Sequence, residues 1–210
     1  SKLTKFLKRL LMKPALAIIP CKTDSTRVKL KNLQEINNKT LLELSIEYAK
    51  RSEIVKDIFV STESNLVKEM ALKEGVEVLH RPSHLLADAE VCDVYVDALQ
   101  QLKACGHDLS VYDYLIALQP DHPDRDNELD TLIEYAFNNK YDDLFTVSSN
   151  IVRTGSIRIL KVDHALQGKV SRRVGCYKDD ATNIHSLEDL DNATRRLNNK
   201  TAVPTTTSNK

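Results

Sequence analysis

The feature that most constrains the fold is a regular alternation of short β-forming runs with longer amphipathic segments. The predicted strands are Ala15–Ile19, Asp57–Ser61, Val76–Leu79, Tyr114–Leu118 and Leu144–Ser148. The segments between them repeat apolar residues at helical spacing and are predicted helices: Lys39–Arg51, Ser64–Glu74, Val91–Cys105 and Leu129–Phe137. Strands that alternate with such helices imply right-handed crossovers and a mostly parallel sheet covered on both faces. The fold class is therefore α/β.

The pattern changes beyond Asn150. Ile157–Leu160 and Arg173–Tyr177 are predicted strands joined by a turn at Gly168, and Ser186–Leu197 is a closing helix with Ser186 as its N-cap. The length predicts a single domain over residues 15–200, followed by a flexible tail over 201–210. Residues 1–14 predict a basic amphipathic helix, for which packing on protein is favoured over contact with a membrane surface.

Charge and cysteine content limit the classes of function. Thirty Lys and Arg balance thirty Asp and Glu, so no global field attracts nucleic acid or an anionic membrane. No apolar run approaches the ~20 residues that span a bilayer. The four cysteines form no C-x-x-C pair and the sequence shows no secretory signal, which indicates reduced thiols and a cytoplasmic location.

The loop Pro20–Asn32 concentrates positive charge directly after the first predicted strand. It contains Lys22, Arg27, Lys29 and Lys31, with hydroxyls at Ser25 and Thr26. Lysine and arginine form charge-assisted hydrogen bonds to phosphate oxygens, so the loop is a candidate anion site. It has no glycine, which excludes a P-loop or a dinucleotide fingerprint. A solvated basic loop is the alternative.

Four segments in order resemble the cytidylyltransferases that activate acidic 2-keto sugars. They are A-I-I-P-C-K-T-D-S-T-R-V-K-L-K-N at 17–32, H-R-P-S-H-L-L-A-D at 80–88, L-Q-P-D-H-P-D-R at 118–125 and N-I-H-S-L-E-D-L at 183–190. The resemblance implies a nucleotidyltransferase architecture, Rossmann-like or GT-A-like, with a mixed, mostly parallel sheet. It also implies a homodimer that joins CMP from CTP to a sialic acid-like nonulosonate or related acid, with release of pyrophosphate.

The resemblance assigns roles residue by residue. Lys31, Lys22 and Arg27 match the family's catalytic cations on the triphosphate. Nucleotide-binding positions are Lys22, Ser25, Arg27, Lys31, Asn32, Arg81 and Cys92. The substrate-binding positions are Gln119 and His122, and the arginines Arg153, Arg158, Arg172 and Arg173 are further candidates for a sugar carboxylate.

The metal ligands depart from the family pattern. The sialic acid branch has two aspartates where this chain has Asn183 and His185, while Asp121 occupies the position of an aspartate that binds metal in the octulosonate branch. We expect a divalent metal, Mg²⁺ or Mn²⁺, at Asp121 and His185, with Mn²⁺ favoured because imidazole suits transition metals. Two other interpretations stay open: a catalytically degenerate nucleotide-binding relative with a regulatory or assembly role, and a metal-dependent sugar transferase of related fold.

Overall fold

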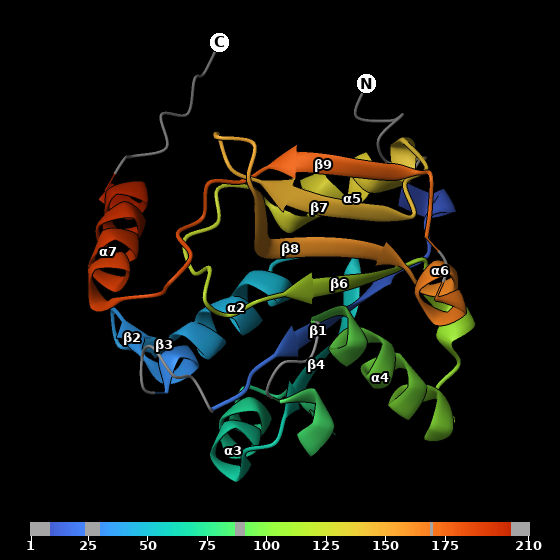
Figure 1. Cartoon of the computed structure of the whole chain (residues 1–210), viewed down its shortest axis with the longest axis horizontal. Helices are drawn as coiled ribbons and strands as arrows, with labels where there is room; N and C mark the ends of the chain where they lie inside the picture. Colours follow the sequence, from blue (N-terminus) through green and yellow to red (C-terminus); the bar gives the residue numbers. More distant parts are fainter. Residues whose placement is uncertain (1–8, 24–29, 87–90, 169, 203–210) are drawn as a thin grey trace.

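The computed structural model describes residues 9–23, 30–86, 91–168 and 170–202 (Figure 1). The strands are β1 (Ala15–Pro20), β2 (Glu35–Ile36), β3 (Lys39–Thr40), β4 (Val55–Thr62), β5 (Glu77–His80), β6 (Tyr114–Leu118), β7 (Asp143–Val147), β8 (Arg153–Lys161) and β9 (Val174–Lys178). The α-helices are α2 (Leu41–Lys50), α3 (Asn65–Lys73), α4 (Val91–Ala104), α5 (Leu129–Asn138), α6 (Val162–Gln167) and α7 (Leu187–Ala202). Short 3₁₀ turns are η1 (Lys31–Leu33), η2 (Ser83–Leu85) and η3 (Leu109–Val111).

Seven strands form one mixed sheet in the order β5-β4-β1-β6-β8-β7-β9. Neighbouring pairs among β5, β4, β1 and β6 are parallel, as are β7 and β9, whereas β8 runs antiparallel to both β6 and β7. The mostly parallel α/β sheet predicted from the sequence is therefore confirmed.

Strand β1 shows why the sheet is covered on both faces. All six of its residues are buried. Ala15, Ala17 and Ile19 join the core beneath α2, α3 and α5, whereas Leu16 and Ile18 join the core beneath α4 and α6. Successive side chains of a strand point to opposite faces, so a fully apolar strand requires a helical layer on each side.

Local signals place two of the helix starts. The Thr40 side chain accepts from the backbone N–H of Glu43, and the Glu43 carboxylate accepts from the N–H of Thr40, which is a capping box for α2. The predicted N-cap at Ser186 is confirmed, because its hydroxyl accepts from the N–H of Asp189 at 3.2 Å. Asp189 in return accepts from the N–H of Ser186 at 2.8 Å.

The predicted connection between the last two strands is wrong. The predicted strand Arg173–Tyr177 overlaps β9, but β9 pairs with β7 and is separated from β8 in the sheet. The chain between them contains α6, and Gly168 ends that helix with φ 62° instead of forming a hairpin turn. The β2–β3 hairpin was also not predicted, because each of its strands has only two residues.

The predicted terminal segments fall largely outside the described residues. Of the N-terminal helix, residues 9–11 are described as helical, and Arg9 pairs with Glu134 at 2.6 Å, with Asp130 at 3.3 Å and with Glu53. Thr201 and Ala202, expected in the flexible tail, belong to α7. Within the described part of the chain, no helix is long and apolar enough to cross a membrane.

Gly175 on β9 gives a stability prediction. A Cβ atom there would lie 2.3 Å from Cε2 of Tyr141, and that ring packs 5.8 Å from the ring of Tyr135. We expect Gly175→Ala to destabilise the protein by about 1–3 kcal/mol through overpacking, more than the ~0.4–1 kcal/mol that a Gly→Ala change gains in the unfolded chain. Urea unfolding measures this change, and the added substitution Tyr141→Ala serves as the control because it removes the clash. Equal stability of Gly175→Ala and the native chain would contradict the packing.

Candidate active site

Two loops at one edge of the sheet form the candidate site. Strands β1 and β6 are parallel neighbours, with Ile18 opposite Ala117, so the loops that follow them begin side by side. The first loop ends in η1, which carries Lys31, and the second carries Asp121. The Lys31 Nζ lies 2.6 Å from Asp121 Oδ2, an ion pair across 90 residues of sequence. Ligands of open α/β sheets bind at this edge, beyond the carboxyl ends of the strands.

Both carboxylate oxygens of Asp121 have partners. Oδ2 accepts from Lys31, and Oδ1 lies 2.9 Å from Nδ1 of His122. Burial acts to raise the pKa of the Asp121 carboxyl, but the hydrogen bond and charge of His122, together with the charge of Lys31, outweigh it. The pKa of Asp121 is therefore held well below its usual range, and the group is an anion at neutral pH.

His122 lies in the protein interior, where a residue that binds substrate at the surface would not be expected. Its residue exposure is 0%, its Nδ1 contacts Asp121, and its Nε2 is buried with no hydrogen-bond partner in the described structure. The sequence suggests a substrate contact at this position. The geometry favours instead an internal contact that fixes the orientation of the Asp121 carboxylate.

The remaining basic residues of the first loop are only partly described. Ser25 and Arg27, both predicted nucleotide contacts, and Lys29 lie outside the described residues. Lys22 donates from Nζ to the carbonyl of Leu86 at 3.0 Å. Asn32 is buried and donates from Nδ2 to the carbonyl of Lys22 at 3.2 Å. Asn32 thus connects η1 to the start of the same loop.

Glu63, directly after β4, connects that loop to the strand beside β1 in the sheet. The sequence did not indicate this role. Its Oε1 accepts from the N–H of Thr23 at 2.8 Å and from the Thr23 hydroxyl at 2.6 Å. Burial, with the charge of Glu63 added, raises the pKa of the Cys21 thiol to about 12. Cys21 is therefore protonated at neutral pH, the form that is not nucleophilic.

The predicted nucleotide contacts Arg81 and Cys92 follow β5. Arg81 is buried, and its Nε and Nη2 both donate to the carbonyl of Leu85, at 2.8 and 2.6 Å. This fork fixes the turn η2 directly before the segment 87–90. Cys92 is partly buried at the start of α4 and lies beside the guanidinium of Arg158.

Gln119 lies at the end of β6. Its side chain is so close to Gly155 that a Cβ atom on that glycine would lie 2.7 Å from it. Its carbonyl accepts from Arg125 Nη2 at 2.7 Å. Arg125 is buried and also lies over the Tyr48 ring at 5.0 Å, so it braces the loop from within the core. Arg125 stands in the quoted motif, but nothing in the sequence indicated this structural role.

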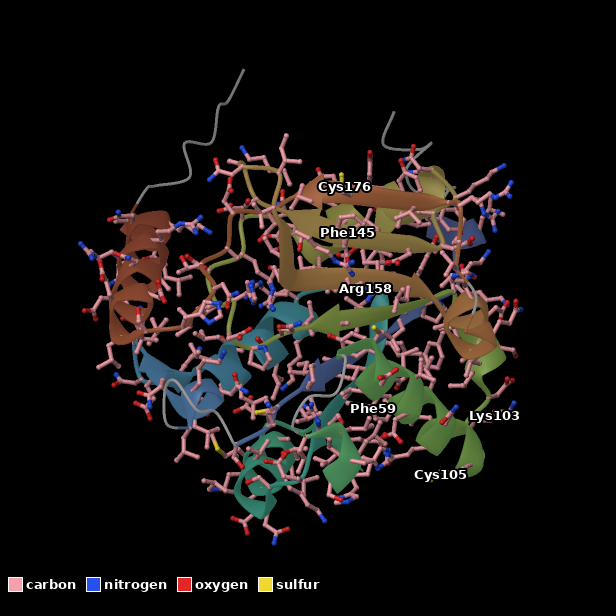
Figure 2. The ribbon with its side chains drawn as sticks, viewed as in Figure 1. Phe59, Lys103, Cys105, Phe145, Arg158 and Cys176 are labelled. Atoms are coloured by element: carbon pink, nitrogen blue, oxygen red, sulfur yellow. The ribbon has the colours of Figure 1, made fainter. Side chains whose placement is uncertain are left out.

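The four arginines considered for a sugar carboxylate are in different situations. Arg158, in the middle of the sheet in Figure 2, pairs with Asp143 through Nε and Nη2 at 3.1 and 2.9 Å. Arg173 pairs in the same two-point manner with Asp142, and Arg153 lies 4.6 Å over the Phe145 ring. Arg172 is exposed.

The structure places the backbone of His185 close to Asp121. It shows no assembled metal site there among the described residues. The N–H of Ile184 donates to the Asp121 carbonyl at 2.9 Å, which places the next residue, His185, beside the loop. The imidazole residue is exposed, and its backbone N–H donates to Asp189. Among the residues that the structure describes, no group of three His, Cys, Asp or Glu side chains is arranged to hold a metal.

Comparison with known proteins assigns the chain to a family. A family model described as "Cytidylyltransferase" matches residues 16–196. The chain belongs to the cytidylyltransferase family. Post-translational flagellin modification protein B of Campylobacter coli is 34% identical over 138 residues, which are 64% of this chain and 58% of that protein. N-acylneuraminate cytidylyltransferase of Escherichia coli is 33% identical over 115 residues, 53% of this chain and 25% of that protein.

A solved structure supports the fold of this cytidylyltransferase. CMP:2-keto-3-deoxy-manno-octonic acid synthetase, in complex with CTP, superposes with a TM-score of 0.69 at 14% identity, over 89% of this chain and 99% of that one. The nucleotidyltransferase-like α/β fold predicted from the sequence is therefore confirmed. The chain spans 58% or less of the length of the two curated relatives described above.

The depressed pKa of Asp121 predicts a pH effect on stability. A carboxyl whose folded-state pKa is lowered stabilises the fold above its ordinary pKa of about 3.9, and that stabilisation is lost as the pH falls below it. We expect Asp121→Asn to lose less free energy of unfolding between pH 5 and pH 3 than the native chain does. Urea unfolding at the two pH values measures this difference. Asp93→Asn, which changes an exposed carboxylate on α4, is the matched control and retains the native pH dependence. Identical pH dependence for Asp121→Asn would contradict the ion pair.

Proposed function

We propose that this protein transfers CMP from CTP to an acidic 2-keto sugar of the nonulosonate class and releases pyrophosphate. The observation that carries the proposal is the Lys31–Asp121 ion pair, which joins the two motif-bearing loops of a cytidylyltransferase at the carboxyl edge of the sheet. The names of the relatives, an N-acylneuraminate cytidylyltransferase and an octonic acid synthetase bound to CTP, support the substrate class.

The proposed reaction is a direct displacement at phosphorus. The anomeric hydroxyl oxygen of the sugar bonds to the α-phosphorus and gives up its proton to water, the bond from that phosphorus to the oxygen that bridges it to the β-phosphorus breaks, and pyrophosphate leaves. Such a reaction requires positioning and neutralisation of charge more than a protein nucleophile. Lys22 and Lys31, with Arg27, are proposed to bind the triphosphate, and Asn32, Ser25, Arg81 and Cys92 to contact the nucleotide. Gln119 is proposed to contact the sugar.

The donor set at Asp121 fits a divalent cation only together with substrate oxygens. Mg²⁺ is commonly bound by one or two carboxylates, with phosphate oxygens and water completing its shell. Asp121 supplies one carboxylate and His185 is the proposed second ligand, which would favour Mn²⁺. When bound, the cation would neutralise charge on the phosphates. Asp121 would hold it, and Lys31 would then be available for the triphosphate.

The pair therefore predicts an exchange of partners. Lys31 Nζ lies 2.6 Å from Asp121 in the structure, and we propose that it leaves this carboxylate for the phosphates when CTP and the cation bind.

A cytoplasmic homodimer is proposed as the working state, and light scattering tests the dimer.

The alternative of a catalytically degenerate relative is favoured by one observation. Asn183 and His185 replace the two aspartates of the sialic acid branch, and both residues are exposed beside the Asp121 loop. Such a protein would bind CTP and release no pyrophosphate with any nonulosonate.

Loss of the loop lysine gives the first functional prediction. We expect Lys31→Ala to lower kcat/KM for CTP by about 10²–10³-fold, because a preorganised charge on the phosphates is lost. Pyrophosphate release with CTP, Mg²⁺ or Mn²⁺ and a panel of nonulosonates measures this loss, with circular dichroism to confirm the fold. Lys39→Ala, which removes a half-exposed lysine paired with Glu47, is the control and retains turnover. Native turnover in Lys31→Ala would remove this loop from the mechanism.

The exchange of partners gives the second functional prediction. In titration calorimetry, we expect Mg²⁺ or Mn²⁺ to tighten CTP binding to the native protein. We expect Asp121→Asn to bind CTP without metal more tightly than the native chain does, since Lys31 is released, and to gain little from added metal. If Asp121→Asn binds metal-free CTP no better than the native chain, the exchange is excluded. Equal or better turnover with Mg²⁺ than with Mn²⁺ would count against His185 as a ligand.

A further inference from the structure

Helix α7 contacts both halves of the candidate site. On its apolar side, Leu190, Ala193 and Leu197 pack with Ile36 of β2 and Leu41 of α2. Asn198 also accepts a hydrogen bond of 2.7 Å from Asn37, in the turn between β2 and β3. Figure 1 shows α7 at the rim of the molecule beside this hairpin. The hairpin follows η1 in the chain, so α7 contacts the segment next to the one that carries Lys31.

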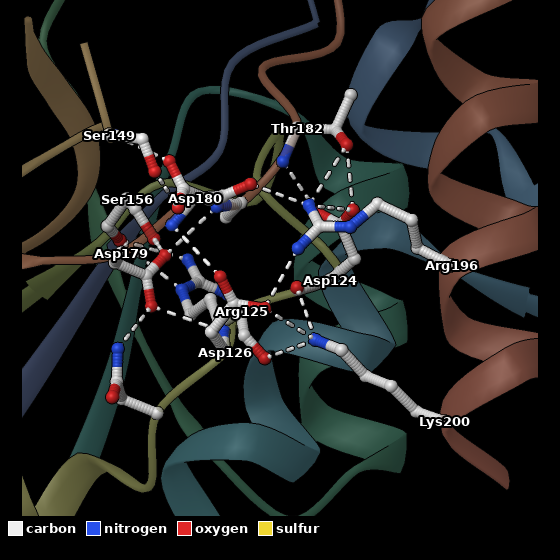
Figure 3. Close-up of polar contacts among 12 residues, drawn as sticks. Asp124, Arg125, Asp126, Ser149, Ser156, Asp179, Asp180, Thr182, Arg196 and Lys200 are labelled. Atoms are coloured by element: carbon white, nitrogen blue, oxygen red, sulfur yellow. Dashed lines mark hydrogen bonds and ion pairs between the residues drawn. The ribbon is translucent and has the colours of Figure 1, made fainter. Parts of the chain in front are cut away.

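The polar side of α7 contacts the loop that follows β6 and carries Asp121 (Figure 3). Arg196 donates from Nη1 to Asp124 Oδ2 and from Nη2 to Asp126 Oδ1, both at 2.8 Å. Lys200 donates from Nζ to the carbonyls of Asp124 and Arg125, at 2.8 and 2.9 Å. These contacts fall on the segment between Asp121 and α5. Because the described part of α7 buries only Ala193 fully, polar contacts contribute much to its placement.

The contact with Asp124 is the critical one, because that carboxylate is completely buried. Its exposure is 0%, and its other donors are the N–H and the hydroxyl of Thr182, both at 2.6 Å. Arg196 is the cation paired with it among the described residues. Removal of its cationic partner would leave an uncompensated buried charge, which is strongly destabilising.

A short path of hydrogen bonds connects this anchor to Asp121. The segment 179–185, which leads into α7, donates from Ile184 N–H to the Asp121 carbonyl at 2.9 Å. Arg125, next to Asp124, donates to the carbonyl of Gln119 at 2.7 Å. The loop from Gln119 to Asp124 is thus held at both ends and at Asp121 itself.

We propose that α7 sets the position of Asp121 relative to Lys31, and that Arg196 is the positioning residue through which it does so. The effect on catalysis rests on the proposed function. The effect on the geometry of the loop does not.

Arg196→Gln tests the proposal, and the neighbouring Arg195→Gln is its matched control. Arg195 is exposed, and its described contacts are with Asn192 and the Asp191 carbonyl of its own helix. We expect Arg196→Gln to lower kcat between about tenfold and a hundredfold, the scale of a small misplacement of catalytic groups. Its CTP affinity without metal is not reduced, since the phosphate-binding loop is untouched. Arg195→Gln retains native kcat. Equal kcat for the two variants would overturn the proposal.

Two further variants separate positioning from loss of folding. Arg196→Lys restores a cation, and Asp124→Asn combined with Arg196→Gln removes the buried charge, so each is expected to recover much of the lost kcat. If neither recovers activity, Arg196 does not act through Asp124 and the proposal fails.

Hydrogen exchange gives a readout that does not depend on activity. We expect the amides of His122 and Asp126 to exchange faster in Arg196→Gln than in the native chain, with no change in β1 or β6. Unchanged exchange at these two amides would overturn the proposal. Were the native protein to show no CTP turnover, the proposed function would fail, and this measurement would still decide the role of α7.

Discussion

The parallel pairing of β1 with β6 is the interaction on which the site depends. These are neighbouring central strands, fully buried on both faces, and their pairing brings together two loops that lie far apart in the sequence. A parallel pair ends both strands at the same edge, where side chains no longer have to fill a core. Charged residues can therefore lie in the loops that follow buried strands, as Lys31 does after β1 and Asp121 does after β6.

The buried acids around this edge are stabilised in different ways. Among the described residues, the hydrogen-bond donors to Asp179 are neutral, such as the Ser156 hydroxyl at 3.1 Å and the N–H of Asp126 at 3.1 Å. Asp124 has Arg196 and Thr182, and Asp121 has Lys31 and His122. Arginine binds with a fixed planar fork, whereas lysine makes a single flexible contact. Of these acids, Asp121 is the one whose cation is suited to exchange for another.

The sequence predicted the first half of the fold better than the second. Ala15–Ile19 and Tyr114–Leu118 are continuous apolar runs, and a strand buried on both faces leaves that signal. The order of β8, β7 and β9 depends on pairing between segments that are distant in the sequence. Local periodicity predicts where strands lie and does not predict which strands pair. Helix α6 has six residues, too few for a helical repeat to be recognised, so Gly168 was interpreted as a hairpin turn when it ends a helix.

The site was predicted in its parts and not in its connections. Lys31 was expected on phosphate and Asp121 on metal, from separate motifs, and no sequence signal indicates that they contact each other. Arg196 lies on a helix of largely charged and polar residues, which by pattern alone resembles a solvated surface. The structure distinguishes it from its neighbour Arg195, because Arg196 pairs with the buried Asp124 and with Asp126 of another segment. If Lys31 binds phosphate and Asp121 binds metal, as we propose, the contact of 2.6 Å between them is the state of the site before either ligand arrives. An ion pair of this kind keeps two opposite charges stabilised at an edge of the sheet where each has a proposed ligand of its own.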